Sequence, residues 1–216
     1  MSPQRQKWEI RTNVPPPSAP HKLRIGLLGG SFNPAHEGHR EISLTALDRL
    51  NLDAIWWLVT PGNPLKPANI YAPYDDRLEH ARAIANHPDI VVSDFESRRG
   101  LQYTVDTLSQ LVEDNPTAKF VWLMGADSFA NFHRWKDWRR IAMLVPIAVF
   151  NRPGSAAAAL SSPAAKALSA ARVAADDAPA IAGESPPAWV FVADISNPAS
   201  STALRSTKGA KEPPRS

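Results

Sequence analysis

The 216-residue sequence contains no cysteine, which excludes disulfide bonds and thiolate metal ligands. It also contains no apolar run of the roughly 18 residues that a membrane-spanning helix requires. Positive charge is in small excess, with 24 Lys and Arg against 21 Asp and Glu, and it is dispersed without interleaved aromatic residues. The composition therefore predicts neither a membrane protein nor a nucleic-acid-binding protein, and it suits a domain with a small anionic ligand.

The two ends of the chain differ in composition from its middle. Residues 1–21 are polar, rich in proline and without the apolar centre of a signal peptide, so we expect a disordered arm on a cytoplasmic protein. Residues 208–216 predict a flexible tail. The length between them suits one domain, over residues 22–207.

A segment rich in alanine, serine and proline interrupts this domain at residues 154–187. Helix propensity predicts a single helix over residues 155–172. The following residues, 176–187, predict a flexible loop. We interpret the whole segment as a variable insertion between two strands of a sheet.

Short apolar segments alternate with segments of helical periodicity along the rest of the domain. Strands are predicted at residues 24–28, 54–59, 90–92, 120–124, 146–150 and 189–192. Helices are predicted from Gly38 onward, over residues 74–87, over residues 104–113 with Thr104 as N-cap, and near Thr202. Apolar strands separated by helices indicate an α/β fold, a Rossmann-like parallel sheet with helices on both faces.

The most informative residues lie between the first strand and the first helix, where Gly29 and Gly30 precede His36 and His39. Ligands of open α/β folds bind at this edge of the sheet. Paired glycines let backbone N–H groups approach a phosphate, and two histidines three residues apart can face one ligand. Zinc binding is the alternative, which we disfavour because a third ligand is missing and the spacing is one residue short of the zinc-protease motif. We expect no metal ligand from protein side chains.

A second anion-binding pattern follows the last strand, where Ser200, Ser201 and Thr202 precede Arg205. Hydroxyls and N–H groups at a helix start, with a guanidinium one turn later, can contact a single anion. Taken alone, this segment also fits an ordinary helix cap with a solvated arginine. We favour the anion site because the first pattern accompanies it.

Residues 29–39 resemble the Gly-Gly-x-Phe-[Asp/Asn]-Pro-x-His-x-Gly-His signature of the nucleotidyltransferase superfamily, and residues 200–205 resemble its Ser-Ser-Thr-x-x-Arg element. The resemblance implies a Rossmann-like domain in which His36, His39 and Arg205 are catalytic. It also implies ATP contacts from Gly29, Gly30, Ser31, Phe32, Ser201 and Thr202. Asn33 stands where many members have aspartate, and we expect it to hold the turn.

Three further segments are similar to the nicotinate mononucleotide adenylyltransferases of that superfamily. They are a Tyr-Thr-x-x-Thr-Leu element from Tyr103, a Gly-x-Asp-Ser…Trp pattern from Gly125 to Trp135, and a loop with a phosphate-facing lysine at Lys66. The similarity implies ATP contacts from Lys66, Gly125 and Asp127. It implies contacts with the mononucleotide from Tyr103, Thr104 and Trp135.

The chemistry of a pyridine carboxylate agrees with these residues. The Trp135 ring can stack on a pyridine, and the helix start at Thr104 offers N–H donors to a carboxylate. Core packing is the alternative for Trp135, and we favour it for Trp138, which would share a helix face with Trp135. Residues 75–77 are expected to form a solvated, charged helix start.

The expected reaction moves the adenylyl group of ATP to nicotinate mononucleotide and releases pyrophosphate. The acceptor phosphate is already anionic, so the protein has to align the reactants and neutralise charge, with Mg²⁺ arriving on ATP. Nicotinamide mononucleotide and phosphopantetheine are the alternative acceptors, and a non-catalytic nucleotide sensor is the alternative outside enzymes. Homo-oligomer formation stays open.

Overall fold

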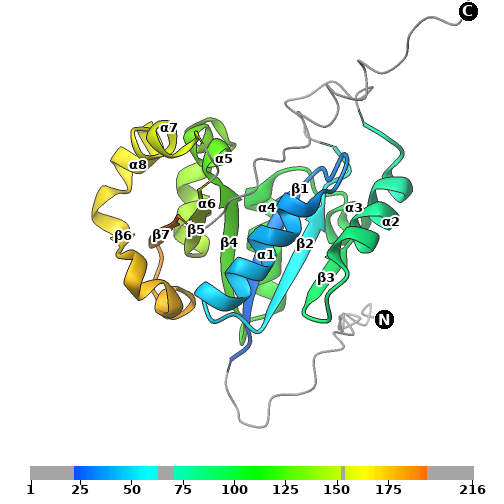
Figure 1. Ribbon diagram of the computed structural model, residues 1–216, viewed down its shortest axis with the longest axis horizontal. Helices are drawn as coiled ribbons and strands as arrows, with labels where there is room; N and C mark the ends of the chain where they lie inside the picture. The colour runs from blue at the N-terminus through cyan, green and yellow to red at the C-terminus, as the bar shows by residue number, and fades with distance from the viewer. Residues whose placement is uncertain (1–21, 63–70, 152–153, 194–216) are drawn as a thin grey trace, which may run out of the picture.

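The computed structural model describes residues 22–62, 71–151 and 154–193, and these contain a seven-stranded parallel sheet in the order β3-β2-β1-β4-β5-β7-β6 (Figure 1). The strands are β1 Arg24–Gly30, β2 Ala54–Val59, β3 Ile90–Ser93, β4 Lys119–Gly125, β5 Ile147–Phe150, β6 Arg172–Val173 and β7 Trp189–Val192. The α/β class and the parallel sheet are therefore as the sequence predicts.

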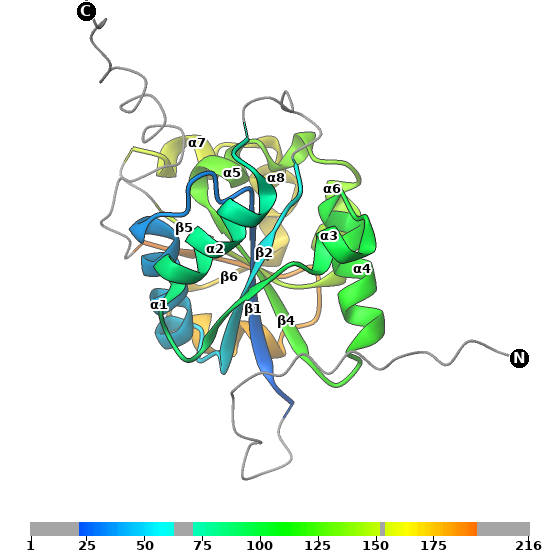
Figure 2. The same cartoon turned by 90° about the vertical axis from the view of Figure 1, so that its right-hand side faces the viewer.

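Helices cover both faces of the sheet, and Figure 2 shows α1 and α2 on one side of it and α3, α4 and α6 on the other. The α-helices are α1 Glu37–Arg49, α2 Tyr74–Ala85, α3 Phe95–Arg99, α4 Thr104–Asp114, α5 Ala126–Ala130, α6 Trp138–Leu144, α7 Ala156–Leu160 and α8 Pro163–Ala167. The 3₁₀ helices are η2 Phe132–Arg134, η3 Ser169–Ala171 and η4 Ala175–Gly183. Within the described residues, no helix combines the length and the apolar character that a membrane crossing requires.

The central strands are apolar on both faces because both faces are covered. Every residue of β2 is buried, and the adjacent Trp56 and Trp57 belong to the two opposite cores. The sequence of a parallel strand that is covered by helices on both faces is apolar throughout, whereas a strand with one solvent-exposed face alternates apolar and polar residues. This explains why the sequence already indicated the strand clearly.

The strand order places a crevice between β1 and β4. The chain leaves β1 for α1 on one face of the sheet and leaves β4 for α5 on the other face. In open parallel sheets, this divergence at the carboxyl ends of neighbouring strands forms the ligand crevice. The fold thus sets the position of a binding site before any side chain is considered.

The insertion departs from the prediction. The single helix expected over residues 155–172 is replaced by α7, α8 and η3, because Ser162 caps a new helix start with Pro163 at its first position. The expected flexible loop at residues 176–187 is largely η4, which buries Ile181 and two alanines in the core. The segment therefore contributes to the core of the domain.

Two expected helix features are also wrong. Thr104 is the first residue of α4, and its N-cap is Tyr103. Trp135 and Trp138 do not share a helix, because Trp135 follows η2 and Asp137 adopts a left-handed backbone with φ 50°. The predicted arm, the predicted tail and the helix expected near Thr202 lie outside the described residues.

Candidate functional site

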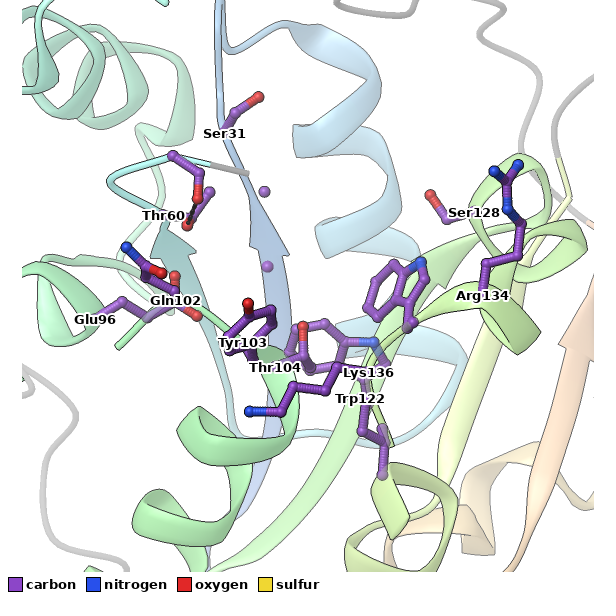
Figure 3. A pocket seen from close by; sticks show the side chains of 15 residues that line it. Ser31, Thr60, Glu96, Gln102, Tyr103, Thr104, Trp122, Ser128, Arg134 and Lys136 are labelled. Carbon is purple, nitrogen blue, oxygen red and sulfur yellow. Dashed lines mark hydrogen bonds between the residues drawn. The ribbon is translucent and has the colours of Figure 1, made fainter. Parts of the chain in front are cut away.

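A pocket of about 490 Å³ opens at the crevice between β1 and β4, a volume typical of small-molecule sites. Its lining consists of Gly29, Gly30, Ser31, Thr60, Gly62, Glu96, Gln102, Tyr103, Thr104, Trp122, Ser128, Arg134, Trp135, Lys136 and Ile141. Figure 3 shows Thr60, Glu96 and Gln102 on one side of it, with Ser128 and Arg134 on the opposite side. The pocket therefore joins the loops after β1, β2 and β4 with the start of α4.

The structure brings several of the predicted site residues together. Those that line this one pocket are Gly29, Gly30, Ser31, Tyr103, Thr104 and Trp135. They come from three segments, around residues 30, 103 and 135, which are brought together by the order of the strands in the sheet.

Gly29 has a packing reason to be glycine. A Cβ atom at this position would overlap the ring of Trp122, which belongs to the neighbouring strand β4 and lines the pocket. The absence of a side chain lets the indole lie directly against the backbone of β1. The floor of the pocket is therefore formed by bare backbone and one aromatic ring.

His36 lies at the end of the loop that contains Ser31, His39 lies in the first turn of α1, and neither belongs to the pocket lining. His36 is the N-cap of α1, His39 is its third residue, and their ring centroids are 3.8 Å apart. The backbone N–H of His36 donates to Nδ1 of His39 at 3.2 Å. This bond requires an unprotonated Nδ1, so neutral His39 carries its proton on Nε2, which is the donor chemistry that a phosphate oxygen requires.

Phe32 anchors this loop to the core. It is 1% exposed, has φ 45°, and stacks on Trp57 with 4.9 Å between ring centroids. Its ring also lies 4.8 Å from that of His39. A ligand contact from Phe32 is consequently confined to its backbone, and its side chain positions the histidine.

The start of α4 forms a further wall of the pocket. Tyr103 is the N-cap, and its carbonyl accepts the N–H groups of Asp106 and Thr107 at 3.0 and 3.1 Å. Thr104, the first residue of the helix, lies where backbone N–H groups have no partner within the helix and where the helix dipole is positive. This end of α4 suits an anionic group in the pocket.

Trp135 enters the pocket from the segment after η2. It is partly exposed and packs edge-on against Trp122 and Phe132, with centroid distances of 6.4 and 5.6 Å and interplanar angles of 80° and 77°. Two edge contacts fix the plane of the ring. Trp138, by contrast, is 8% exposed and belongs to the core, as predicted.

Lys136 connects this segment to α4. Its Nζ lies 4.1 Å from the ring centroid of Tyr103 and 3.6 Å from a carboxylate oxygen of Asp106. Both partners are on α4 or at its cap. The ammonium group therefore joins the Trp135 segment to the start of α4. Figure 3 shows the Lys136 side chain pointing toward α4.

Glu96 is a buried carboxyl group beside the pocket, 6% exposed. Its Oε1 accepts the hydroxyl hydrogen of Thr107 at 2.9 Å. Burial raises the pKa of the Glu96 carboxyl, and the Thr107 hydrogen bond opposes that rise only in part. Glu96 thus ties α3 to the first turn of α4.

The remaining predicted residues are placed as follows. Gly125 is the buried last residue of β4, and Asp127 is exposed on α5. Neither of them lines the pocket, although Ser128, the residue after Asp127, does. Asn33 is buried, and its Oδ1 accepts the N–H of Ala72 at 3.0 Å, which joins its loop to the segment before α2. Lys66, Ser201, Thr202 and Arg205 lie outside the described residues.

Several pocket residues were missed by the sequence reasoning. Arg134 and Lys136 are the sequence neighbours of Trp135, so their position beside a predicted ligand residue was the available signal. Glu96 stands in the segment before Tyr103 and carried no assigned role. Among residues 22–62, 71–151 and 154–193, no group of three or more histidine or acidic side chains could hold a metal ion.

Comparison with known proteins adds sequence relatives. The model of the cytidylyltransferase-like family matches residues 27–207. A protein of Methylorubrum extorquens, named probable nicotinate-nucleotide adenylyltransferase, is 52% identical over 183 residues, covering 85% of this chain and 99% of its own length. A protein of Rhizobium meliloti with the same name is 52% identical over 186 residues, covering 86% and 99%.

The fold also resembles a solved structure. Nicotinic acid mononucleotide adenylyltransferase of Plasmodium falciparum, complexed with NaAD, superposes with a TM-score of 0.62 over 85% of this chain and 83% of that chain, at 16% identity. At this identity the likeness concerns the fold alone.

Replacing Glu96 by glutamine should change how stability depends on pH. The pKa of the Glu96 carboxyl is higher in the folded protein than in the unfolded chain, where it is about 4.3. Its contribution to the free energy of unfolding is therefore complete below the unfolded pKa and is lost as the pH rises through the folded pKa. The free energy of unfolding of Glu96→Gln should therefore rise relative to wild type as the pH increases above the unfolded pKa. Urea denaturation across this pH range measures it.

The control variant is Glu79→Gln, which removes one carboxylate from an exposed position on α2. A stability difference between Glu96→Gln and wild type that stays constant with pH, or that matches the Glu79→Gln difference, would contradict the role of burial.

Proposed function

The chain belongs to the cytidylyltransferase-like family, and we propose that it is an enzyme that transfers the adenylyl group of ATP to nicotinate mononucleotide. An oxygen of the acceptor phosphate bonds to the α-phosphorus of ATP, the bond from that phosphorus to the β-phosphate bridge breaks, and pyrophosphate leaves. The product is nicotinate adenine dinucleotide, an intermediate of NAD biosynthesis. The observation that carries the proposal is 52% identity to proteins named nicotinate-nucleotide adenylyltransferase along almost their whole length.

The pyridine end of the acceptor fits the wall formed by Trp135 and α4. A pyridine ring stacked on Trp135 would place its carboxylate near the N–H groups at Thr104, with Tyr103 beside it. The carboxylate is matched to the positive end of the helix dipole, and the neutral amide of nicotinamide mononucleotide is matched less well. Nicotinate is therefore the preferred acceptor.

The triphosphate fits the loop after β1. Backbone groups of Gly29, Gly30, Ser31 and Phe32 would contact ATP, and His36 and His39 would hold its phosphates as charge develops at the α-phosphorus. Contacts from Lys66, Gly125, Asp127, Ser201 and Thr202, and a leaving-group contact from Arg205, belong to the same proposal.

The reaction needs no side chain to act as a base, because the acceptor phosphate is ionised near neutral pH. The protein supplies alignment and charge neutralisation, which are the main sources of catalysis in transfers to phosphorus. ATP enters as its Mg²⁺ complex, with the ion held by phosphate oxygens and water. We place this reaction in the cytoplasm, where ATP is abundant, and assign it to one domain of residues 22–207.

An acceptor panel tests the activity directly. Pyrophosphate release from ATP should be fastest with nicotinate mononucleotide, slower with nicotinamide mononucleotide and absent with phosphopantetheine. The measurement is kcat/KM for each acceptor at saturating Mg²⁺ and ATP. Turnover with phosphopantetheine alone, or with no acceptor, would replace the proposed function.

His39→Ala should lower kcat by about 10²-fold or more, a typical cost of removing one preorganised charge stabiliser. Steady-state kinetics measures the effect, with thermal unfolding as the check on folding. His87→Ala is the matched control, because His87 lies before β3 at the opposite edge of the sheet. Near-normal turnover in folded His39→Ala would remove His39 from the mechanism.

Trp135→Ala should raise KM for the mononucleotide by about 5-fold or more and leave KM for ATP almost unchanged, because stacking is worth about 0.5–1.5 kcal/mol beyond area burial. Trp135→Phe keeps a flat ring and should recover most of the loss. Equal increases in both KM values would show that Trp135 acts only through packing.

A further inference from the structure

Arg77 on α2 is a buried cation. The sequence predicted it to be solvated with Asp75 and Asp76, and those two residues are indeed exposed, but Arg77 is only 3% exposed. Arginine is rarely buried this far without a partner that compensates its desolvation. Its partners therefore identify what it does.

The Arg77 guanidinium bonds four backbone carbonyl oxygens. Nη1 donates to Ser31 at 2.5 Å and to Thr60 at 2.9 Å, Nη2 donates to Pro61 at 2.9 Å, and Nε donates to Ala72 at 3.1 Å. Ser31 follows β1, and Thr60 and Pro61 follow β2. One planar group thus fixes the separation of the two loops at the carboxyl edge of the sheet.

Both of these loops form part of the pocket. Ser31 and Thr60 line it, and Figure 3 shows them from the loops after adjacent strands. Arg77 lies behind the lining and does not belong to it. Its contact with a ligand is therefore indirect, through the backbone of these two residues.

Among the described residues, no acid forms an ion pair with this guanidinium. The guanidinium also lies over the rings of Tyr71 and Tyr74, at 5.4 and 5.2 Å from their centroids. Burial lowers the pKa of Arg77 from its usual value, but a guanidinium starts so high that it remains charged. A full positive charge consequently stands directly behind the loop after β1.

Other contacts place the same loop against α2. The carbonyl of Ala35 accepts from Nε2 of His80 at 3.1 Å, and Asn33 accepts the N–H of Ala72 just before α2. Contacts at residues 31, 33 and 35 therefore brace the loop along the stretch that precedes the two histidines.

We propose that Arg77 is a positioning residue for ATP, which sets the shape of the loop after β1 against the loop after β2 and adds positive potential behind it. The inference rests on the proposed function. In the described part of the chain, the polar and ring contacts of Arg77 lie on these loops, just before α2 and at its first residue, and none of them involves α4 or Trp135. Its shortest hydrogen bond is to Ser31, on the loop assigned to the triphosphate, so its effect falls on ATP more than on the mononucleotide.

Lysine cannot replace arginine in this role. The guanidinium offers five N–H donors in a fixed plane, whereas an ammonium is a point charge with three donors on a flexible stem. A lysine would keep the charge but leave carbonyls from separate segments without a common partner. The pair Arg77→Lys and Arg77→Gln therefore separates geometry from charge.

The test measures KM for both substrates, kcat, and ATP affinity by calorimetry in Arg77→Lys and Arg77→Gln. ATP KM and Kd should rise about 10-fold or more in both variants, since small misplacements of a binding loop are costly, while mononucleotide KM stays within about 2-fold. Arg82→Gln, an exposed arginine on the same helix, is the control and should behave as wild type.

His80→Leu keeps the test decisive if the Arg77 variants do not fold, because His80 is exposed and makes one contact with the same loop. It should raise ATP KM by about 2- to 5-fold, with thermal unfolding close to wild type. Three results would overturn the inference: ATP affinity unchanged in the folded variants, wild-type ATP affinity in Arg77→Lys, or equal increases in KM for ATP and for the mononucleotide. Failure of wild type to use ATP would instead refute the proposed function.

Discussion

The site depends on the divergence of two neighbouring parallel strands. Because β1 leads to a helix on one face and β4 to a helix on the other, a crevice opens between their carboxyl ends. Gly29 deepens it, since the missing side chain admits the ring of Trp122 from β4. All other features of the pocket are loops and caps gathered around this opening, so mutations that shift the β1–β4 pairing would disturb both substrate regions together.

The histidine loop is fixed by aromatic packing and short polar contacts rather than by regular structure. Phe32 stacks on Trp57, whose Nε1 donates to Ser43 Oγ at 2.8 Å, and Ser43 in turn donates to the His39 carbonyl at 2.9 Å. The backbone of His36 completes the set by holding Nδ1 of His39. The buried strand β2 thereby helps to place the His39 imidazole, and the His36 backbone sets its tautomer, which together give the preorganisation that charge stabilisation requires.

The parts of the site that sequence reasoning located are those whose chemistry is local. Each of these features can be recognised within a few residues: the paired glycines before a helix, the histidines at its first turn and the threonine at a helix start. The alternation of apolar strands and helices predicted the parallel sheet. The boundaries between elements were harder to predict. Helix propensity over the alanine-rich insertion outweighed the Ser162–Pro163 cap signal, and the left-handed Asp137 separated Trp135 from Trp138 in a way that periodicity does not register.

Arg77 could not have been found this way, because its partners on the two loops lie 46, 17 and 16 residues away and are carbonyl groups that every residue possesses. Beside two aspartates it has the sequence character of a solvated helix start, and only the sheet order brings the loops after β1 and β2 within its reach. Glu96 presents the complementary case, an acid whose burial favours the neutral form near a crevice suited to anions. The buried arginine adds positive charge behind the crevice, and burial of Glu96 opposes the negative charge that its carboxyl group would otherwise place beside an anionic ligand.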